Sequence, residues 1–175
     1  MLDDFKIIFA IDPGLSGGIA YKNGNKIDAV KMPREPKEMQ RFFNQIKGMK
    51  RSLCFIEMLN MRPQDMQGGK AFGIQKMLAN YEQTKAILSA CNITTIQVVP
   101  RKWQADLNLK GKKNETKTVR KNRFKRFAQH HFKNKRVILQ TADAYVILYW
   151  GLFKMKHDPG YILQRLPRED LDVNF

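Results

Sequence analysis

The feature that most constrains the fold is the dipeptide Asn23-Gly24, which lies between two runs of strand-like composition. Asn-Gly is the strongest short-range signal for a two-residue hairpin. Residues 15–21 and 26–32 are therefore expected to pair as antiparallel strands. The apolar run 6–11, which ends abruptly at Asp12-Pro13-Gly14, supplies a third strand. We expect three antiparallel strands to open the chain.

Helical and strand patterns alternate after this hairpin. In chain order they predict a helix over 39–46, a strand over 53–56, a long helix over about 69–90, a strand over 95–99, a helix within 110–136 and a buried apolar helix over about 142–156. This order predicts an α/β protein with a mixed five-stranded sheet flanked by helices. Because the chain shows neither an internal repeat nor a long linker, we expect residues 1–175 to form one domain.

The charge of the chain points to a polyanionic partner. There are 32 Lys and Arg against 16 Asp and Glu, so the formal charge is +16. Nucleic acid is the first partner to consider, and an anionic membrane surface is the second. Twelve of the basic residues and a single acid lie between residues 110 and 136. Hydrophobic residues make up 43% of the chain, which excludes a disordered basic tail.

The same composition bears on the compartment. No apolar run approaches the roughly 20 residues that a membrane helix needs. The first residues, Met1 to Asp4, are acidic where a targeting segment is basic. Cys54 and Cys91 lie in apolar segments and are expected to be buried, reduced thiols. We therefore expect a cytoplasmic protein.

Three carboxylates lie where a buried element begins or ends. Asp12 follows the run KIIFAI, Glu57 follows LCFI, and Asp143 precedes AYVILYW. Each one alone has a simpler interpretation: a partner Lys or Arg for any of them, a turn for Asp12, a helix N-terminus for Asp143. The three together favour a shared site. Carboxylates without a Cys or His cluster suit a hard cation such as Mg²⁺, and two such ions can hydrolyse a phosphodiester.

The sequences around these acids resemble a known family. IDPGLSGGIA, CFIEMLN and TADAYVIL are similar to the motifs of RuvC-type Holliday junction resolvases, over about residues 6–155. The resemblance implies a ribonuclease H-like fold. It also implies a crossover junction endodeoxyribonuclease that nicks four-way junctions in pairs, with Mg²⁺, in two ions, as cofactor and Mn²⁺ as a substitute. A bacterial cell or a phage-infected host would be the setting, and branched DNA the partner.

The resemblance also assigns roles to residues. It makes Asp12, Glu57 and Asp143 the metal ligands and catalytic carboxylates. Gln140 stands where relatives often carry a further acid or His. Lys117 best matches a basic residue that reaches the scissile phosphate, with Lys112 and Lys113 as rivals. Met61 or Arg62 stands where some relatives insert an aromatic wedge into the junction.

The remaining candidates come from the basic segment and the turns. The expected DNA contacts are Lys110, Lys112, Lys113, Lys117, Arg120, Lys121, Met61 and Arg62. Residues 16–18 can bring backbone N–H groups to a phosphate or can form only the tight start of a strand. Trp103 can stack on a base or can pack in the core.

Two questions stay open at this level. The alternatives to a junction-selective enzyme are a less selective nuclease of the same fold, acting on flaps, forks or RNA–DNA hybrids, and a non-catalytic protein that binds branched DNA. The second question is assembly, because paired nicks call for a two-fold homodimer. The helix over 69–90, with Phe72, is the expected surface, unless Phe72 only completes the core. The +16 charge makes the dimer weak in isolation.

Overall fold

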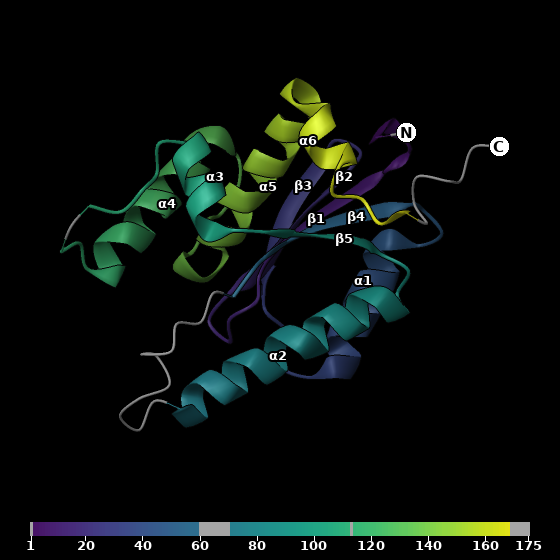
Figure 1. The fold of residues 1–175 in the computed structure, drawn as a ribbon, viewed down its shortest axis with the longest axis horizontal. Coiled ribbons are helices and arrows are strands. Elements are labelled where there is room, and N and C mark those ends of the chain that lie inside the picture. The colour runs from purple at the N-terminus through teal and green to yellow at the C-terminus, as the bar shows by residue number, and fades with distance from the viewer. Residues whose placement is uncertain (1, 60–70, 113, 169–175) are drawn as a thin grey trace.

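The computed structural model describes residues 2–59, 71–112 and 114–168. Its elements are, in chain order, the 3-10 helix Leu2–Asp4, β1 (Ile7–Asp12), β2 (Gly18–Asn23), β3 (Lys26–Lys31), α1 (Pro36–Lys47), β4 (Ser52–Glu57), α2 (Ala71–Ala90), β5 (Thr94–Val98), α3 (Pro100–Asp106), α4 (Lys117–His131), α5 (Leu139–His157) and α6 (Pro159–Leu163). Helices lie on both faces of one central sheet (Figure 1).

The five strands form a mixed sheet in the order β3-β2-β1-β4-β5. The hairpin β2–β3 and the pair β1–β2 are antiparallel, whereas β4 runs parallel to β1 and β5 runs parallel to β4. The predicted α/β class, the mixed five-stranded sheet and its antiparallel start are therefore confirmed.

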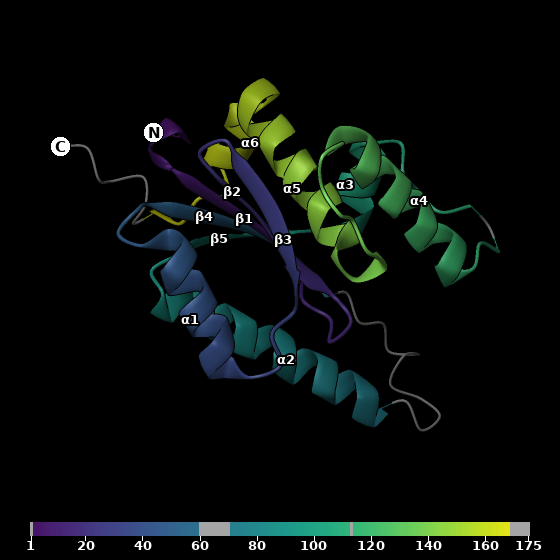
Figure 2. The same cartoon turned by 180° about the vertical axis from the view of Figure 1, so that it is seen from behind.

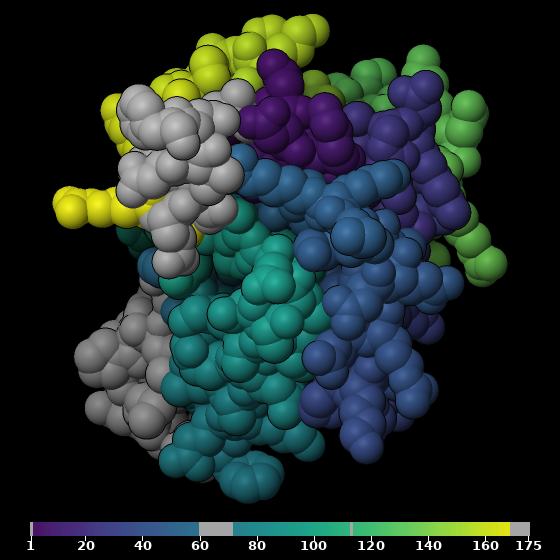
Figure 3. All heavy atoms as spheres, turned by 90° about the vertical axis from the view of Figure 1, so that its right-hand side faces the viewer, coloured from purple at the N-terminus to yellow at the C-terminus, as the bar shows by residue number. Residues whose placement is uncertain are grey.

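The sheet separates two cores. Side chains alternate along a strand, so in β1 Ile8 and Ala10 face α5, whereas Ile7, Phe9 and Ile11 belong to the opposite core with α1. Seen from behind, α1 and α2 cover one face of the sheet, and α3 to α6 cover the other (Figure 2). In the space-filling view, α1 and α2 lie next to one another in blue and teal (Figure 3).

Helix α5 lies close against the sheet at two glycines. A Cβ on Gly18 in β2 would come within 2.9 Å of the Gln140 carbonyl oxygen. A Cβ on Gly151 would come within 2.3 Å of the Phe55 ring in β4. Gly18 allows the start of α5 to approach the sheet, and Gly151 allows its middle to do so. These two close contacts fix how α5, and with it Asp143, lies on the sheet.

Three local differences from the predicted elements have physical causes. Strand β2 begins at Gly18 rather than at residue 15, because the Gly17 N–H donates to the Gly14 carbonyl oxygen and closes a tight turn. Helix α3 was not expected, since Pro100 marked the end of β5; proline is equally suited to the first turn of a helix. Helix α6 begins in the same way at Pro159.

Two compositional expectations concern burial. Cys54 and Cys91 are free thiols and both are buried, as predicted. Within the described ranges, no helix combines the length and the apolar character that crossing a membrane requires.

Candidate active site

Asp12 and Glu57 end neighbouring parallel strands. Ile11 of β1 stands beside Ile56 of β4, so the two carboxylates follow at the same edge of the sheet. Asp12 continues the alternation of Ile8 and Ala10, and Glu57 continues that of Leu53 and Phe55. Both acids therefore face α5 rather than α1.

Asp143 joins them from α5. In the sheet, Asp12 pairs with Gly18, and Gly18 is the residue that the first turn of α5 contacts. Asp143 lies one turn beyond that contact and is buried, with a relative exposure of 9%. The three carboxylates that the sequence singled out are thus carried by two adjacent strand ends and the beginning of one helix.

Lys121 of α4 lies between two of these acids. Its Nζ is 3.8 Å from Asp12 Oδ2 and 3.5 Å from Asp143 Oδ2. All three side chains are largely enclosed, with 16% of Lys121, 16% of Asp12 and 13% of Asp143 exposed. A single ammonium group therefore offsets part of the negative charge of the site, and it does so where screening by water is weak.

The electrostatics of the site disfavour ionised carboxylates. Burial, with the negative charges of Asp12 and Asp143, raises the pKa of Glu57 to about 8. Burial and the charge of Asp12 raise the pKa of Asp143 to about 6, against the lowering effect of Lys121. Burial also raises the pKa of Asp12. Because desolvation and mutual repulsion disfavour the ionised carboxylates, additional positive charge would stabilise their ionised form.

Glu57 has a buried hydrogen-bond donor. The indole Nε1 of Trp103 donates to Glu57 Oε2 at 2.9 Å. Trp103 is fully buried and meets Phe124 of α4 edge to face, with ring centroids 5.1 Å apart. Of its two open interpretations, core packing holds and base stacking is wrong, because the ring is inaccessible. No local pattern in the sequence connects Trp103 with Glu57.

The turn after β1 is held by two polar contacts. Asn80 of α2 donates through Nδ2 to the Pro13 carbonyl oxygen at 2.6 Å. Asp12 Oδ1 accepts from the Gly14 N–H at 3.5 Å. A Cβ on Gly17 would come within 2.1 Å of the Asp12 carbonyl oxygen, so this position requires glycine. The tight-start interpretation of residues 16–18 therefore accounts for Gly17.

The donor set fits a hard divalent cation. Asp143 Oδ1 is buried and has no hydrogen-bond partner among the described residues, which leaves one carboxylate oxygen available as a ligand. Carboxylate oxygens are the ligands that Mg²⁺ prefers. As the side chains stand, no three acidic, His or Cys side chains of the described ranges are arranged to hold a metal directly. Lys121 Nζ lies beside Asp12 and Asp143, so its ammonium group would have to move away before a divalent cation could bind there.

Other predicted residues lie around this centre. Lys117 and Arg120 are exposed residues in the first turns of α4, and the charge of each lowers the pKa of Asp12. Gln140 is half-buried one turn before Asp143, at the start of α5. Lys110 and Lys112 are exposed in the segment before α4. Lys113, Met61 and Arg62 lie outside the described residues.

Lys121 was expected only as a DNA contact, and the structure places it at the carboxylates. Lys117 and Lys121 lie four residues apart on α4 and share one face of that helix. Helical spacing therefore shows which lysines share the face. It does not show which of them reaches the strand ends, since this depends on how α4 packs against α5 and α3.

Comparison with known proteins gives the fold. No protein-family model matches the chain, and no curated relative matches its sequence. Thermus thermophilus RuvC in complex with a Holliday junction substrate matches with a TM-score of 0.56 at 12% identity, over 87% of this chain and 96% of that one. Thermus thermophilus RuvC in another structure matches with a TM-score of 0.53 at 13% identity, over 91% and 98%. The chain has the ribonuclease H-like fold of RuvC.

Proposed function

We propose that this protein is a Mg²⁺-dependent endonuclease that cleaves branched DNA, with four-way junctions as the preferred substrate. The observation that carries the proposal is the convergence of Asp12, Glu57 and Asp143 at one edge of a RuvC-like sheet, with Lys121 among them. A formal charge of +16 supports a DNA substrate, and the solved junction complex of RuvC supports the branched form.

The chain's own groups divide the work. Asp12, Glu57 and Asp143 would hold the metal, which when bound activates a water molecule and stabilises the leaving oxygen. The half-buried Gln140, one turn before Asp143, is proposed to assist metal binding through its amide oxygen. Lys121, released from the carboxylates, is placed to contact a phosphate oxygen, and the exposed Lys117 and Arg120 of the same helix extend that positive charge outward.

The first prediction is that Asp12→Asn strongly reduces cleavage and preserves binding. Loss of one carboxylate ligand should reduce Mg²⁺-dependent nicking by at least about a hundredfold. Junction affinity should stay the same or increase, because one charge that repels phosphate is gone. Labelled four-way junction, flap, RNA–DNA hybrid and linear duplex are each incubated with and without Mg²⁺, and the nicks are mapped.

The outcomes of that experiment separate the alternatives. Nicking of all branched substrates at similar rates would indicate a less selective nuclease of this fold. Junction binding by the unchanged protein without nicking in Mg²⁺ or Mn²⁺ would indicate a non-catalytic binding protein. Near-normal nicking by Asp12→Asn would contradict the proposed site.

The second prediction compares Lys121 and Lys117. Lys121→Ala should lower the cleavage rate at saturating junction by at least about tenfold, because Lys121 is the lysine that lies beside Asp12 and Asp143. Lys117→Ala should mainly weaken binding, since Lys117 is exposed. Single-turnover cleavage and equilibrium binding measure the two effects.

The control for this pair is Lys125→Ala. Lys125 lies one turn beyond Lys121 on α4 and lines a shallow groove with Asn122, Arg126 and Gln129. It should leave the cleavage step unchanged. A larger loss of cleavage rate in Lys117→Ala than in Lys121→Ala would indicate that Lys117, and not Lys121, acts at the scissile phosphate.

A further inference from the structure

Trp103 is the described residue whose side chain hydrogen-bonds to the Glu57 carboxylate. Its Nε1 lies 2.9 Å from Glu57 Oε2 and no part of its side chain is exposed. We propose that Trp103 is a positioning residue, whose indole N–H holds the Glu57 carboxylate in the orientation that binds metal. This inference rests on the proposed function, because it gives Glu57 a metal to bind.

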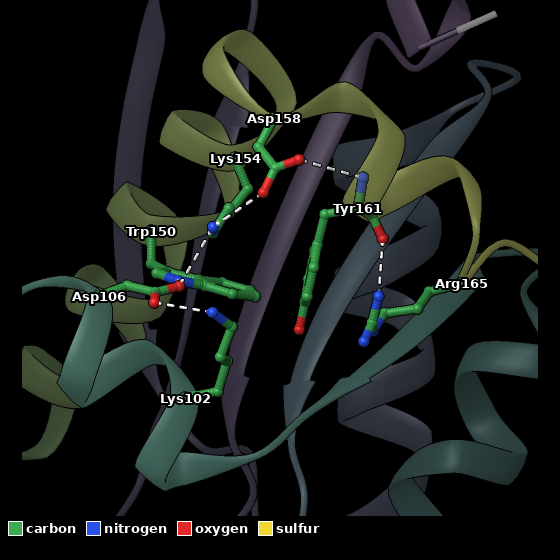
Figure 4. Close-up of polar contacts among 7 residues, drawn as sticks. All are labelled: Lys102, Asp106, Trp150, Lys154, Asp158, Tyr161 and Arg165. Carbon is green, nitrogen blue, oxygen red and sulfur yellow. Dashed lines mark hydrogen bonds and ion pairs between the residues drawn. The ribbon is translucent and has the colours of Figure 1, made fainter.

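The indole can hold Glu57 because its own helix is fixed. Helix α3 has only seven residues, which is too short to be stable by itself. At its last residue, Asp106 Oδ2 accepts from Trp150 Nε1 of α5 at 2.9 Å, and Asp106 Oδ1 accepts from Lys102 Nζ at 2.9 Å. Lys154 Nζ lies 3.3 Å from the same carboxylate (Figure 4). Asp106 thus ties α3 to α5, the helix that carries Asp143.

The Trp103 side of the contact is enclosed. Phe124 of α4 packs against the Trp103 ring, so the indole cannot rotate away without opening the core. With Oε2 engaged by Trp103, Glu57 can offer its other oxygen as a ligand. An indole is only a donor, so it favours the ionised carboxylate and leaves that oxygen free. Groups that orient metal ligands in this way are worth about 10- to 100-fold in metal affinity.

The test removes the indole N–H donor of Trp103 and keeps an aromatic side chain at that position. Trp103→Phe should raise the Mg²⁺ concentration for half-maximal cleavage by about 10- to 100-fold, with a smaller change in the rate at saturating Mg²⁺. The rise in melting temperature that Mg²⁺ produces without DNA should shrink in parallel. In a Glu57→Gln background, Trp103→Phe should cause no further loss of this metal-induced rise. Equal additional loss in both backgrounds would overturn the proposal, because Trp103 would then act independently of Glu57.

The matched control is Phe43→Leu. Phe43 is a fully buried aromatic residue in the core on the opposite face of the sheet. Phe43→Leu should lower the melting temperature without changing the metal-induced rise. An equal reduction of that rise by Phe43→Leu would mean that Trp103→Phe reports only lost stability. A metal-induced rise that is absent in the unchanged protein would instead contradict the proposed function.

A second measurement does not require Trp103 to be replaced. Because the sequence has two tryptophans, the unchanged protein should give two indole N–H signals in an NMR spectrum, and the one that disappears in Trp150→Phe belongs to Trp150. In the unchanged protein the other signal, that of Trp103, should shift as Mg²⁺ is added, with the same midpoint as cleavage. A Trp103 signal that stays constant across that range would overturn the proposal.

Discussion

At the scale of single residues, the site is a balance between buried acids and one buried base. Burial alone would make Asp12 and Asp143 costly as anions. Lys121 lies within 4 Å of both and reduces that cost without removing it, because the pKa of each acid stays raised. Asp143 Oδ1, which is buried without a hydrogen-bond partner among the described residues, is the oxygen whose negative charge is not compensated. The metal-free site is therefore held together by a group that also repels a divalent cation.

The third prediction concerns the pH dependence of the metal-free protein. Because the pKa of Glu57 rises from 4.5 to about 8 on folding, the native state holds a proton that the unfolded chain releases. The contribution of Glu57 to the free energy of unfolding is complete below pH 4.5 and is lost as the pH rises toward 8. Urea unfolding in EDTA between pH 5 and 8.5 should show this decline.

Glu57→Gln should flatten the decline above pH 6, since glutamine does not titrate, whereas Asp143, with its pKa raised to about 6, still contributes below that pH. The control is Glu82→Gln, because Glu82 pairs with Lys85 at the surface and its side chain is 62% exposed. Its curve should follow that of the unchanged protein. A Glu57→Gln curve as steep as the original between pH 6 and 8.5 would show that another group causes the decline there.

At the scale of elements, α5 is the helix that brings Asp143 to the two carboxylates at the edge of the sheet. It lies across the sheet face to which Asp12 and Glu57 point, and Gly18 and Gly151 allow the close approach. Phe55, which lies under Gly151, also packs edge to face against Trp150 at 6.0 Å. The depth of α5 is therefore coupled to the anchoring of α3 through Trp150.

The fourth prediction is that Gly151→Ala destabilises the protein. Its Cβ would fall within 2.3 Å of the buried Phe55 ring, and overpacking of this kind costs about 1–3 kcal/mol. The control is Gly73→Ala in α2, where no atom lies within 4 Å of the added Cβ. That change should stabilise by roughly 0.5–1 kcal/mol, as expected for alanine in a helix. Chemical unfolding measures both, and a neutral Gly151→Ala would mean that α5 can shift outward.

The sequence predicted the elements whose patterns are long or repeated. The Asn23-Gly24 hairpin, the parallel strands and the apolar α5 all lie where their patterns indicated. The sequence did not predict α3, because seven residues after a proline carry too little periodicity. It placed Asp12, Glu57 and Asp143 by their position beside buried runs. The Trp103 and Lys121 contacts depend on how α3 and α4 pack, which no local pattern contains.

At the scale of the whole molecule, charge and an exposed apolar side chain act against each other. The formal charge of +16 opposes self-association at low salt. On α2, Phe72 is 78% exposed, so the interpretation that it completes the core is wrong. We retain the proposal of a weak homodimer through α2, strengthened by salt or by a junction that presents two equivalent sites.

The fifth prediction is that Phe72→Ser weakens this dimer. Sedimentation at several salt concentrations, with and without a four-way junction, should show two protomers per junction for the unchanged protein and fewer for Phe72→Ser. Met49→Ser is the control, because Met49 is exposed in the turn after α1 rather than on α2. One protomer per junction at saturation, with both nicks still made, would exclude the dimer.

The order of the three carboxylates along the chain also bears on synthesis in the cell. Asp12 and Glu57 are synthesised before Asp143 and α5, the helix that covers their sheet face. A nascent chain that stops before α5 carries two of the three carboxylates and an uncovered apolar face. If the protein has the proposed nuclease function, such a fragment lacks one of the three metal ligands, and an aborted translation product should not cleave DNA.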